Sequence, residues 1–243
     1  MRIEEYPRNL EMLARSYITG FLAEGSKEAL IERAKQLSFV IKNKRKKTPA
    51  TWKFSIPLER PLIFKMAEVD GFRLQVDIAC DIEGCGDDIS RQSVVLRVWS
   101  LDENVSYREQ LDAFGLKEIL GSCNWKRVML RFHLDRRDPQ ARKLEPLFHL
   151  QVGGTARDEE NCWLHKSIDV PRFHHPPMDI VLLCEFILVN FFDKDSENLR
   201  KKPEWRSLVR KSQDIFQSNY FTNCVNHLKD TTSTLLESST INS

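Results

Sequence analysis

The sequence has no long, uninterrupted apolar run. Its longest apolar stretch, residues 178–192, is short for a bilayer span and contains Asp179, Glu185 and Asn190. Residues 1–5 include acidic side chains where a secretory signal peptide has its apolar region. From these two absences we expect a soluble protein in the cytoplasm that does not bind membranes.

An excess of charge and a dense set of cysteines are also missing. The 243 residues carry a formal net charge of only +2, so no global field draws the molecule onto nucleic acid. The six cysteines are spread singly, and a chain of this length buries a large core without disulfides. Cys80 and Cys85 lie close together, but a zinc site of this kind needs a second close pair. We therefore expect reduced thiols, no bound metal and no cofactor.

The short motifs of known chemistries do not occur either. The sequence contains no GxGxxG or Walker lysine pattern, no HExxH, no EF-hand loop and no recognisable helix-turn-helix. The nucleophile motifs of serine and cysteine hydrolases are absent too. Function has to be inferred from the fold and from the side chains that the fold brings together.

Hydrophobic periodicity divides the chain into helical and extended regions. Apolar residues recur at helical spacing over residues 10–22 and 30–41, which predicts a helical hairpin around Gly25. From Thr51 the period changes to two, most regularly over residues 72–82. Further strands are predicted at residues 94–101, 127–135, 147–153 and 162–170, and further helices at residues 105–120, 178–192 and from 203 onward.

These patterns predict an α+β fold with a central antiparallel sheet and helices on one face. The N-terminal helical hairpin precedes the sheet, and two C-terminal helices close the core. Residues 1–230 are expected to form a single domain, and residues 231–243, rich in Ser and Thr, a flexible tail. Glu185 falls inside the most apolar helix, so we expect an arginine or histidine to meet its carboxylate.

Four predicted strands alternate strictly between polar and apolar side chains. Their apolar rows must face the helices, so their polar rows share the other side of the sheet. The polar residues are Arg73, Gln75, Asp77, Asp81, Arg97, Arg131, His133, Asp135, His149 and Gln151. The simplest interpretation is a solvated face, because antiparallel sheets often leave one side in water.

Two histidines on this face suggest a catalytic alternative. If the strands that carry them pair with equal offsets about their loop, His133 lies opposite His149. Arg131 then lies opposite Gln151. Directly opposed residues are about 5 Å apart at Cβ, so the two imidazoles could act on one bound atom.

Such a histidine pair suits phosphodiester cleavage, because imidazoles exchange protons near neutral pH. One histidine would act as the base and the other as the acid. Arg131 or Arg97 would stabilise charge on the phosphate, and Asp135 would orient an imidazole. A metal ion held by both histidines and either Asp77 or Asp135 is the other option. Neither strand has the serine or threonine two residues after its histidine that two-histidine phosphoesterases use, which weakens the enzymatic alternative.

Residues 171–177 combine three prolines with two adjacent histidines. The segment precedes a predicted helix, and helix N-termini favour anions. Arg172, His174 and His175 are therefore candidates for binding a phosphate or carboxylate. If the segment folds over the polar side of the sheet, one of its histidines joins the histidine pair. The simpler interpretation is a stiff connector that sets the direction of the helix.

A basic run ends the second predicted helix and is the candidate contact for nucleic acid. Its residues are Lys42, Lys44, Arg45, Lys46 and Lys47. Cations are also favoured at a helix C-terminus on electrostatic grounds alone.

Two functions of different classes remain. The first is an interaction module or subunit of a larger complex, which binds an unidentified protein through the sheet face, the basic run or the aromatic residues Trp99 and Trp163. The second is a nucleic-acid-acting hydrolase, of phosphodiesterase or ribonuclease type, built on His133 and His149. A hydrolase needs the imidazoles in a concave pocket, whereas a module presents a flat or convex face. We expect the interaction module, because it is the commoner class.

Overall fold

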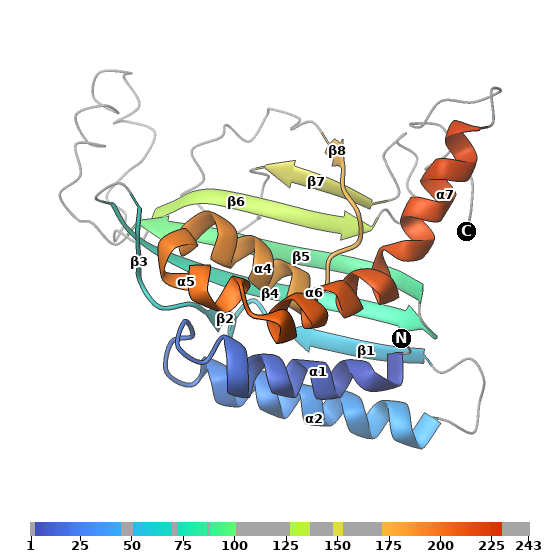
Figure 1. Ribbon diagram of the computed structural model, residues 1–243, viewed down its shortest axis with the longest axis horizontal. Coiled ribbons are helices and arrows are strands. Elements are labelled where there is room, and N and C mark those ends of the chain that lie inside the picture. The colour runs from blue at the N-terminus through green and yellow to red at the C-terminus, as the bar shows by residue number, and fades with distance from the viewer. Residues whose placement is uncertain are drawn as a thin grey trace.

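The computed structural model describes residues 3–44, 51–69, 72–86, 88–100, 127–136, 148–152 and 172–229. These residues form an antiparallel sheet of eight strands with helices on one side of it, which confirms the predicted α+β fold (Figure 1). Several predicted features lie outside the described residues: the helix at 105–120, the strand at 162–170, the tail at 231–243, and the residues Arg45, Lys46, Lys47 and Trp163.

The helices precede and follow the sheet in the chain. They are η1 (Ile3–Glu5), α1 (Tyr6–Met12), the π-helical η2 (Leu13–Tyr17), α2 (Ser26–Lys44), α4 (Ile180–Phe191), α5 (Asp193–Arg200), α6 (Pro203–Phe216) and α7 (Ser218–Leu228). Within these described ranges, no helix has the length and apolar character that a bilayer span requires.

The strands lie in the order β1-β4-β5-β6-β7-β8, and β2 and β3 pair with β4 beyond the end of β1. Their bounds are β1 (Thr51–Ile56), β2 (Leu62–Ile63), β3 (Ala67–Val69), β4 (Phe72–Cys85), β5 (Asp88–Ser100), β6 (Arg127–Arg136), β7 (Phe148–Val152) and β8 (Arg172–His174). The long hairpin of β4 and β5 is the centre to which the other strands are added.

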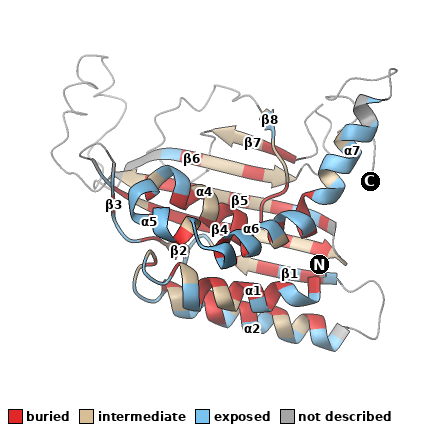
Figure 2. Ribbon diagram, viewed as in Figure 1, coloured by how far each residue is buried: buried red, intermediate tan, exposed pale blue. Residues whose placement is uncertain are grey.

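The core lies between the helices and the apolar side of β1, β4 and β5. Figure 1 shows α4 and α6 over β4 and β5, with α1 and α2 beside β1, and Figure 2 shows buried positions concentrated on these elements. The alternation in β4 and β5 buries every second side chain almost completely, namely Val76, Ile78, Ile82, Val94, Leu96 and Val98. Burying one such side chain stabilises the fold by about 1.5–3 kcal/mol, so this layer dominates the stability.

The predicted N-terminal hairpin is formed by α1 and η2 on one arm and α2 on the other. Gly25 takes a φ of +80° between the arms, a conformation that costs glycine little. The hydroxyl of Ser26 accepts a hydrogen bond of 3.0 Å from the N–H of Ile63, which ties the start of α2 to β2. Tyr6 of α1 lies edge-on to Phe216 of α6, with ring centroids 5.0 Å apart. The two ends of the chain therefore close the same core.

Asp179 is a fully buried carboxylate at the start of α4. One oxygen accepts a 3.0 Å hydrogen bond from the N–H of Leu182, and the other accepts a 2.6 Å bond from the hydroxyl of Ser212 on α6. Burial raises the pKa of Asp179, and these hydrogen bonds oppose the rise. A buried carboxylate with these donors fixes α4 against α6.

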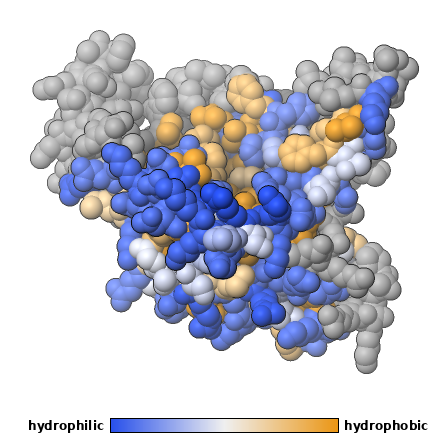
Figure 3. Space-filling view, viewed as in Figure 1, coloured by the Kyte–Doolittle hydropathy of each residue, from blue (hydrophilic) through white to orange (hydrophobic). Residues whose placement is uncertain are grey.

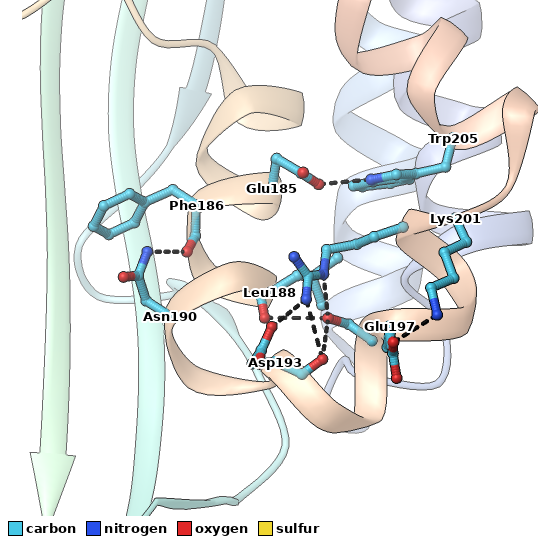
Figure 4. A network of polar contacts seen from close by, with 10 residues as sticks. Glu185, Phe186, Leu188, Asn190, Asp193, Glu197, Lys201 and Trp205 are labelled. Atoms are coloured by element: carbon cyan, nitrogen blue, oxygen red, sulfur yellow. Dashed lines mark hydrogen bonds and ion pairs between the residues drawn. The ribbon is translucent and has the colours of Figure 1, made fainter.

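The two predicted C-terminal helices are present as α4 and α6, with α5 between them and α7 following Gln217. Glu185 of α4 accepts a 2.6 Å hydrogen bond from the indole Nε1 of Trp205 on α6 (Figure 4). The expected arginine or histidine partner is therefore wrong, because a buried indole also needs an acceptor and supplies the donor. In the same network the buried hydroxyl of Ser196 on α5 donates to the carbonyl of Leu188 on α4, at 3.2 Å.

Candidate functional site on the polar side of β6, β7 and β8

Strand pairing gathers polar side chains on the side of the sheet away from the helices. Residues opposite each other in antiparallel strands have side chains on the same side, about 5 Å apart at Cβ. One row joins Ser93, Asp135, His149 and His174, the next joins Val95, His133, Gln151 and Arg172, and a third pairs Arg97 with Arg131. We call Arg131, His133, Asp135, His149, Gln151, Arg172 and His174 the polar cluster.

The two central histidines do not lie opposite each other. His133 pairs with Gln151, and Asp135 pairs with His149. The predicted opposition of His133 to His149, and of Arg131 to Gln151, is therefore wrong by two residues, because a long connection between strands does not fix their register. Side chains alternate with a period of two, so the shift keeps both imidazoles on one side as diagonal neighbours.

The middle of this side is buried. Arg131 is 4% exposed and His149 is 5% exposed, and Asp77 and Arg97 on the neighbouring strands are buried as well. The interpretation of a simply solvated face is therefore wrong at these positions. Charged side chains are rarely this buried unless they are paired, so each needs a physical explanation.

Asp77, Arg97 and Trp99 form a closed unit at the β4–β5 end of this side. Arg97 donates from Nε to Asp77 Oδ1 at 2.8 Å and from a terminal nitrogen to Oδ2 at 3.0 Å. The Trp99 indole also donates to Asp77 Oδ2 at 2.7 Å, and its ring lies under the Arg97 guanidinium, 5.0 Å from the ring centroid. Arg97, predicted to bind phosphate, thus neutralises a buried carboxylate, and Trp99, predicted to be an exposed contact, is half-buried in the same unit.

His133 and Asp135 differ from that unit. Burial, the charge of Arg131 and the neighbouring His149, in order of decreasing effect, together lower the pKa of His133 to about 4. Burial also raises the pKa of Asp135, against a hydrogen bond from Ser93. Among the described residues, His133 Nε2 and Asp135 Oδ1 are buried without a hydrogen-bond partner. Buried polar atoms are usually satisfied, so these two atoms are candidates for a chemical role in the polar cluster.

The segment around residues 171–177 begins as a strand. β8 pairs with β7, which places His174 opposite His149 and Arg172 opposite Gln151, in the polar cluster. His175 is one residue further along: its N–H donates to the Phe148 carbonyl at 3.2 Å, and its Nδ1 lies 2.7 Å from the Pro176 carbonyl. Alternation turns His175 away from the cluster.

The predicted anion site at the start of α4 is already filled. The N-terminal amide of Leu182 donates to the chain's own carboxylate, Asp179, so the helix end is capped from within. Arg172 and His174 belong to the polar cluster rather than to this helix end.

Two other predicted contacts receive no support. Within the described residues no group of three His, Cys, Asp or Glu side chains could hold a metal ion, so the metal site built on both histidines with Asp77 or Asp135 is not formed there. Of the basic run, Lys42 is exposed near the end of α2, and Lys44 is the last residue of that helix.

The opposite side of the same strands carries apolar side chains that the helices cover only in part. Phe132 lies opposite Val152, and Leu150 opposite Phe173, while Phe132 packs edge-on against Phe186 of α4 at 6.0 Å. We call Leu130, Phe132, Leu150, Val152, Phe173, Phe186 and Val189 the apolar patch. Phe173 is 56% exposed, and Leu130 and Val189 are exposed too. Figure 3 shows apolar side chains gathered over β6, β7 and β8.

Helix α7 continues this apolar character beyond the body of the molecule. Its sequence, residues 218–228, contains no Asp, Glu, Lys or Arg. Phe221 and Val225, one turn apart, are 51% and 50% exposed. Tyr220 packs against Phe148 of β7 with ring centroids 6.0 Å apart, so the base of α7 is held beside the sheet (Figure 1).

Sequence reasoning missed both apolar surfaces. It assumed that every apolar row of the sheet faces a helix, and it did not single out Phe221 or Val225 in the helix predicted from residue 203 onward. The available signal was the absence of charge over residues 218–228, because exposed helical surfaces are normally charged.

Comparison of the chain with protein-family models, with curated proteins and with solved structures gives no match.

Proposed function

We propose that this protein is an interaction module that binds a protein partner through the apolar patch. The observation that carries this proposal is the incomplete cover of the apolar side of β6–β8, where Leu134 and Phe148 are buried but Leu130 and Phe173 are exposed. A sheet normally buries its apolar side against another layer.

The energetics favour a covered patch. Each Å² of apolar surface removed from water contributes about 25 cal/mol, and large contiguous apolar patches on soluble proteins usually mark binding sites. Phe173 and Phe132 are aromatic, and aromatic residues are enriched in protein interfaces.

The test compares three tagged baits: the wild type, Phe173→Asp and Phe39→Asp. Phe39 lies on α2 and is 70% exposed, more than Phe173, so it is a matched control outside the patch. We expect a partner captured from cells that make the protein to bind wild type and Phe39→Asp, and to be lost from Phe173→Asp. The same order must hold when the partner is purified and titrated. Equal binding of all three baits would contradict the proposal.

A second candidate function is a nucleic-acid-acting hydrolase of phosphodiesterase or ribonuclease type on the polar cluster. It is favoured by the two buried, unsatisfied atoms His133 Nε2 and Asp135 Oδ1. With its pKa lowered to about 4, His133 is neutral at pH 7 and serves as a proton acceptor. The proton donor would be another member of the cluster, His149 or His174, and Arg131 would stabilise the developing phosphate charge.

This candidate is tested with single-stranded RNA and a chromogenic phosphodiester as substrates. Activity should fall at least about tenfold in His133→Gln. Loss of a proton-transfer group usually lowers the rate by more than this. His175→Gln is the control, since alternation along the chain turns His175 away from the cluster. Equal rates for wild type and His133→Gln, or no cleavage at all, would exclude the hydrolase.

A further inference from the structure

The apolar patch and one side of α7 are two partly exposed apolar surfaces on the same chain. The patch has a floor of β6, β7 and β8 and a flank from α4, because Phe132 is in contact with Phe186 and Val189 lies one turn further along that helix. A sheet surface flanked by one helix is completed by a second helix beside the first. The element that fits it is an amphipathic helix with few charges.

Helix α7 has that chemistry. Phe221 and Val225 are spaced four residues apart, so they form one exposed apolar stripe, and the helix carries no Asp, Glu, Lys or Arg. The core of a protein interface is likewise depleted of charge and enriched in aromatic residues. Figure 1 shows α7 leading away from the helices over β4 and β5, and Phe221 and Val225 are about half exposed.

We propose that the partner is a second copy of this chain, in a two-fold dimer in which α7 of each copy packs on the apolar patch of the other. This inference rests on the proposed interaction function and names its partner. A two-fold interface uses each contact twice, so two modest surfaces add to one larger interface. Stable interfaces bury about 800 Å² on each partner, and both reciprocal contacts of a two-fold dimer contribute to this area.

The first experiment is sedimentation equilibrium of the purified full chain over a concentration series. Wild type and the control Phe39→Asp should form dimers. Phe173→Asp, which alters the patch, and Val225→Asp, which alters α7, should each weaken dimerisation at least about tenfold, the scale of an interface anchor residue. Far-UV circular dichroism of all four proteins checks that the variants remain folded.

The decisive experiment mixes the two defective variants. A dimer of Phe173→Asp has two altered patches, and a dimer of Val225→Asp has two altered helices. A mixed dimer retains one intact contact, between the α7 of the first variant and the patch of the second. An equimolar mixture should therefore form dimers at concentrations at which neither variant dimerises alone.

Three results would overturn the inference. A monomeric wild type that still binds a different captured protein, with loss in Phe173→Asp, excludes self-association while the interaction function stands. A monomeric wild type whose binding is unaffected by Phe173→Asp excludes both. Dimers that survive both variants, or that mixing fails to restore, exclude the exchange of α7 between copies.

Discussion

The two halves of the sheet solve the same packing problem differently. On β4 and β5 the apolar side is covered by α4 and α6, and the polar side is closed by the Asp77–Arg97–Trp99 unit. On β6, β7 and β8 the apolar side is covered only in part, since Leu130 and Phe173 are exposed, and the polar side contains buried atoms of His133 and Asp135 without a hydrogen-bond partner. The apolar side is therefore covered more completely in the first half than in the second.

Residues that stabilise the fold differ in this respect from residues that are candidates for a function. Polar residues that stabilise the fold have their hydrogen-bond partners nearby. Asp77, for example, accepts three hydrogen bonds. Functional surfaces are those where burial and chemistry do not match. Four measurements test this division, from the largest expected effect to the smallest.

The largest effect is expected from Asp77→Ala. This change leaves the buried Arg97 guanidinium without its carboxylate, and removing one partner of a buried pair costs about 3–5 kcal/mol of unfolding free energy. Urea denaturation measures the loss. The control is Asp81→Ala, whose partner Lys53 is half exposed, so the loss there should stay near or below about 1 kcal/mol. Similar losses in the two variants would remove the distinction between a closed unit and a surface pair.

The next prediction compares the same substitution, leucine to alanine, in the two halves of the sheet. Leu96→Ala on β5 empties a fully buried site and should cost about 2–5 kcal/mol. Leu130→Ala on β6 removes an exposed side chain and should cost less than about 1 kcal/mol. Both values come from urea denaturation at low protein concentration. A large loss for Leu130→Ala would show that the patch is covered within one chain.

The pH dependence of stability should report His133. Its folded pKa of about 4 lies below the unfolded value of about 6.5, so folding favours the neutral ring. This contribution is fully present above about pH 6.5 and is lost as the pH falls toward 4, by at most about 3 kcal/mol. The unfolding free energy of wild type should therefore fall more steeply over this window than that of His133→Gln.

Asp135 titrates against this trend. Its raised pKa gives a contribution that is present at low pH and lost as the pH rises above the unfolded value. Asp135 contributes to both proteins, so its contribution cancels when the unfolding free energy of His133→Gln is subtracted from that of wild type at each pH. Parallel curves for the two proteins would mean that His133 is not buried as neutral imidazole.

The smallest effect is expected from Phe173→Ala. Its side chain is more than half exposed, so the unfolding free energy should change by no more than about 0.5 kcal/mol. Partner binding should weaken in the same variant. A variant that loses stability instead would place Phe173 among the residues that hold the fold.

The side of the sheet on which a residue lies was predicted better than the residue that lies opposite it. Strict alternation placed Arg131, His133, Asp135 and His149 on one side of the sheet, and the pairing confirms this. Periodicity gives the side of a strand but not its register, so the opposition of the two histidines was mispredicted by two residues. The burial of Arg131 and His149 was missed for a similar reason, because the pattern of one strand does not show which segments pack on it.

Partners that depend on tertiary packing were also out of reach. The carboxylate of Glu185 meets Trp205, twenty residues later and on another helix, through a donor that charge-pairing rules do not consider. The Arg97–Asp77 pair follows from the register of the β4–β5 hairpin, whose turn is short, but the two residues were not predicted to pair. A tight turn fixes the register of the strands that it joins, whereas a long connection leaves it open.

The meeting of Tyr6 with Phe216 has a consequence for biosynthesis. A ribosome adds about 5–20 residues per second, so Tyr6 waits roughly 10–40 s before the segment that contains Phe216 is made. During that interval the N-terminal hairpin has its apolar stripe without the C-terminal helices that cover it. The order of translation therefore leaves this apolar stripe uncovered until the last helices have been made.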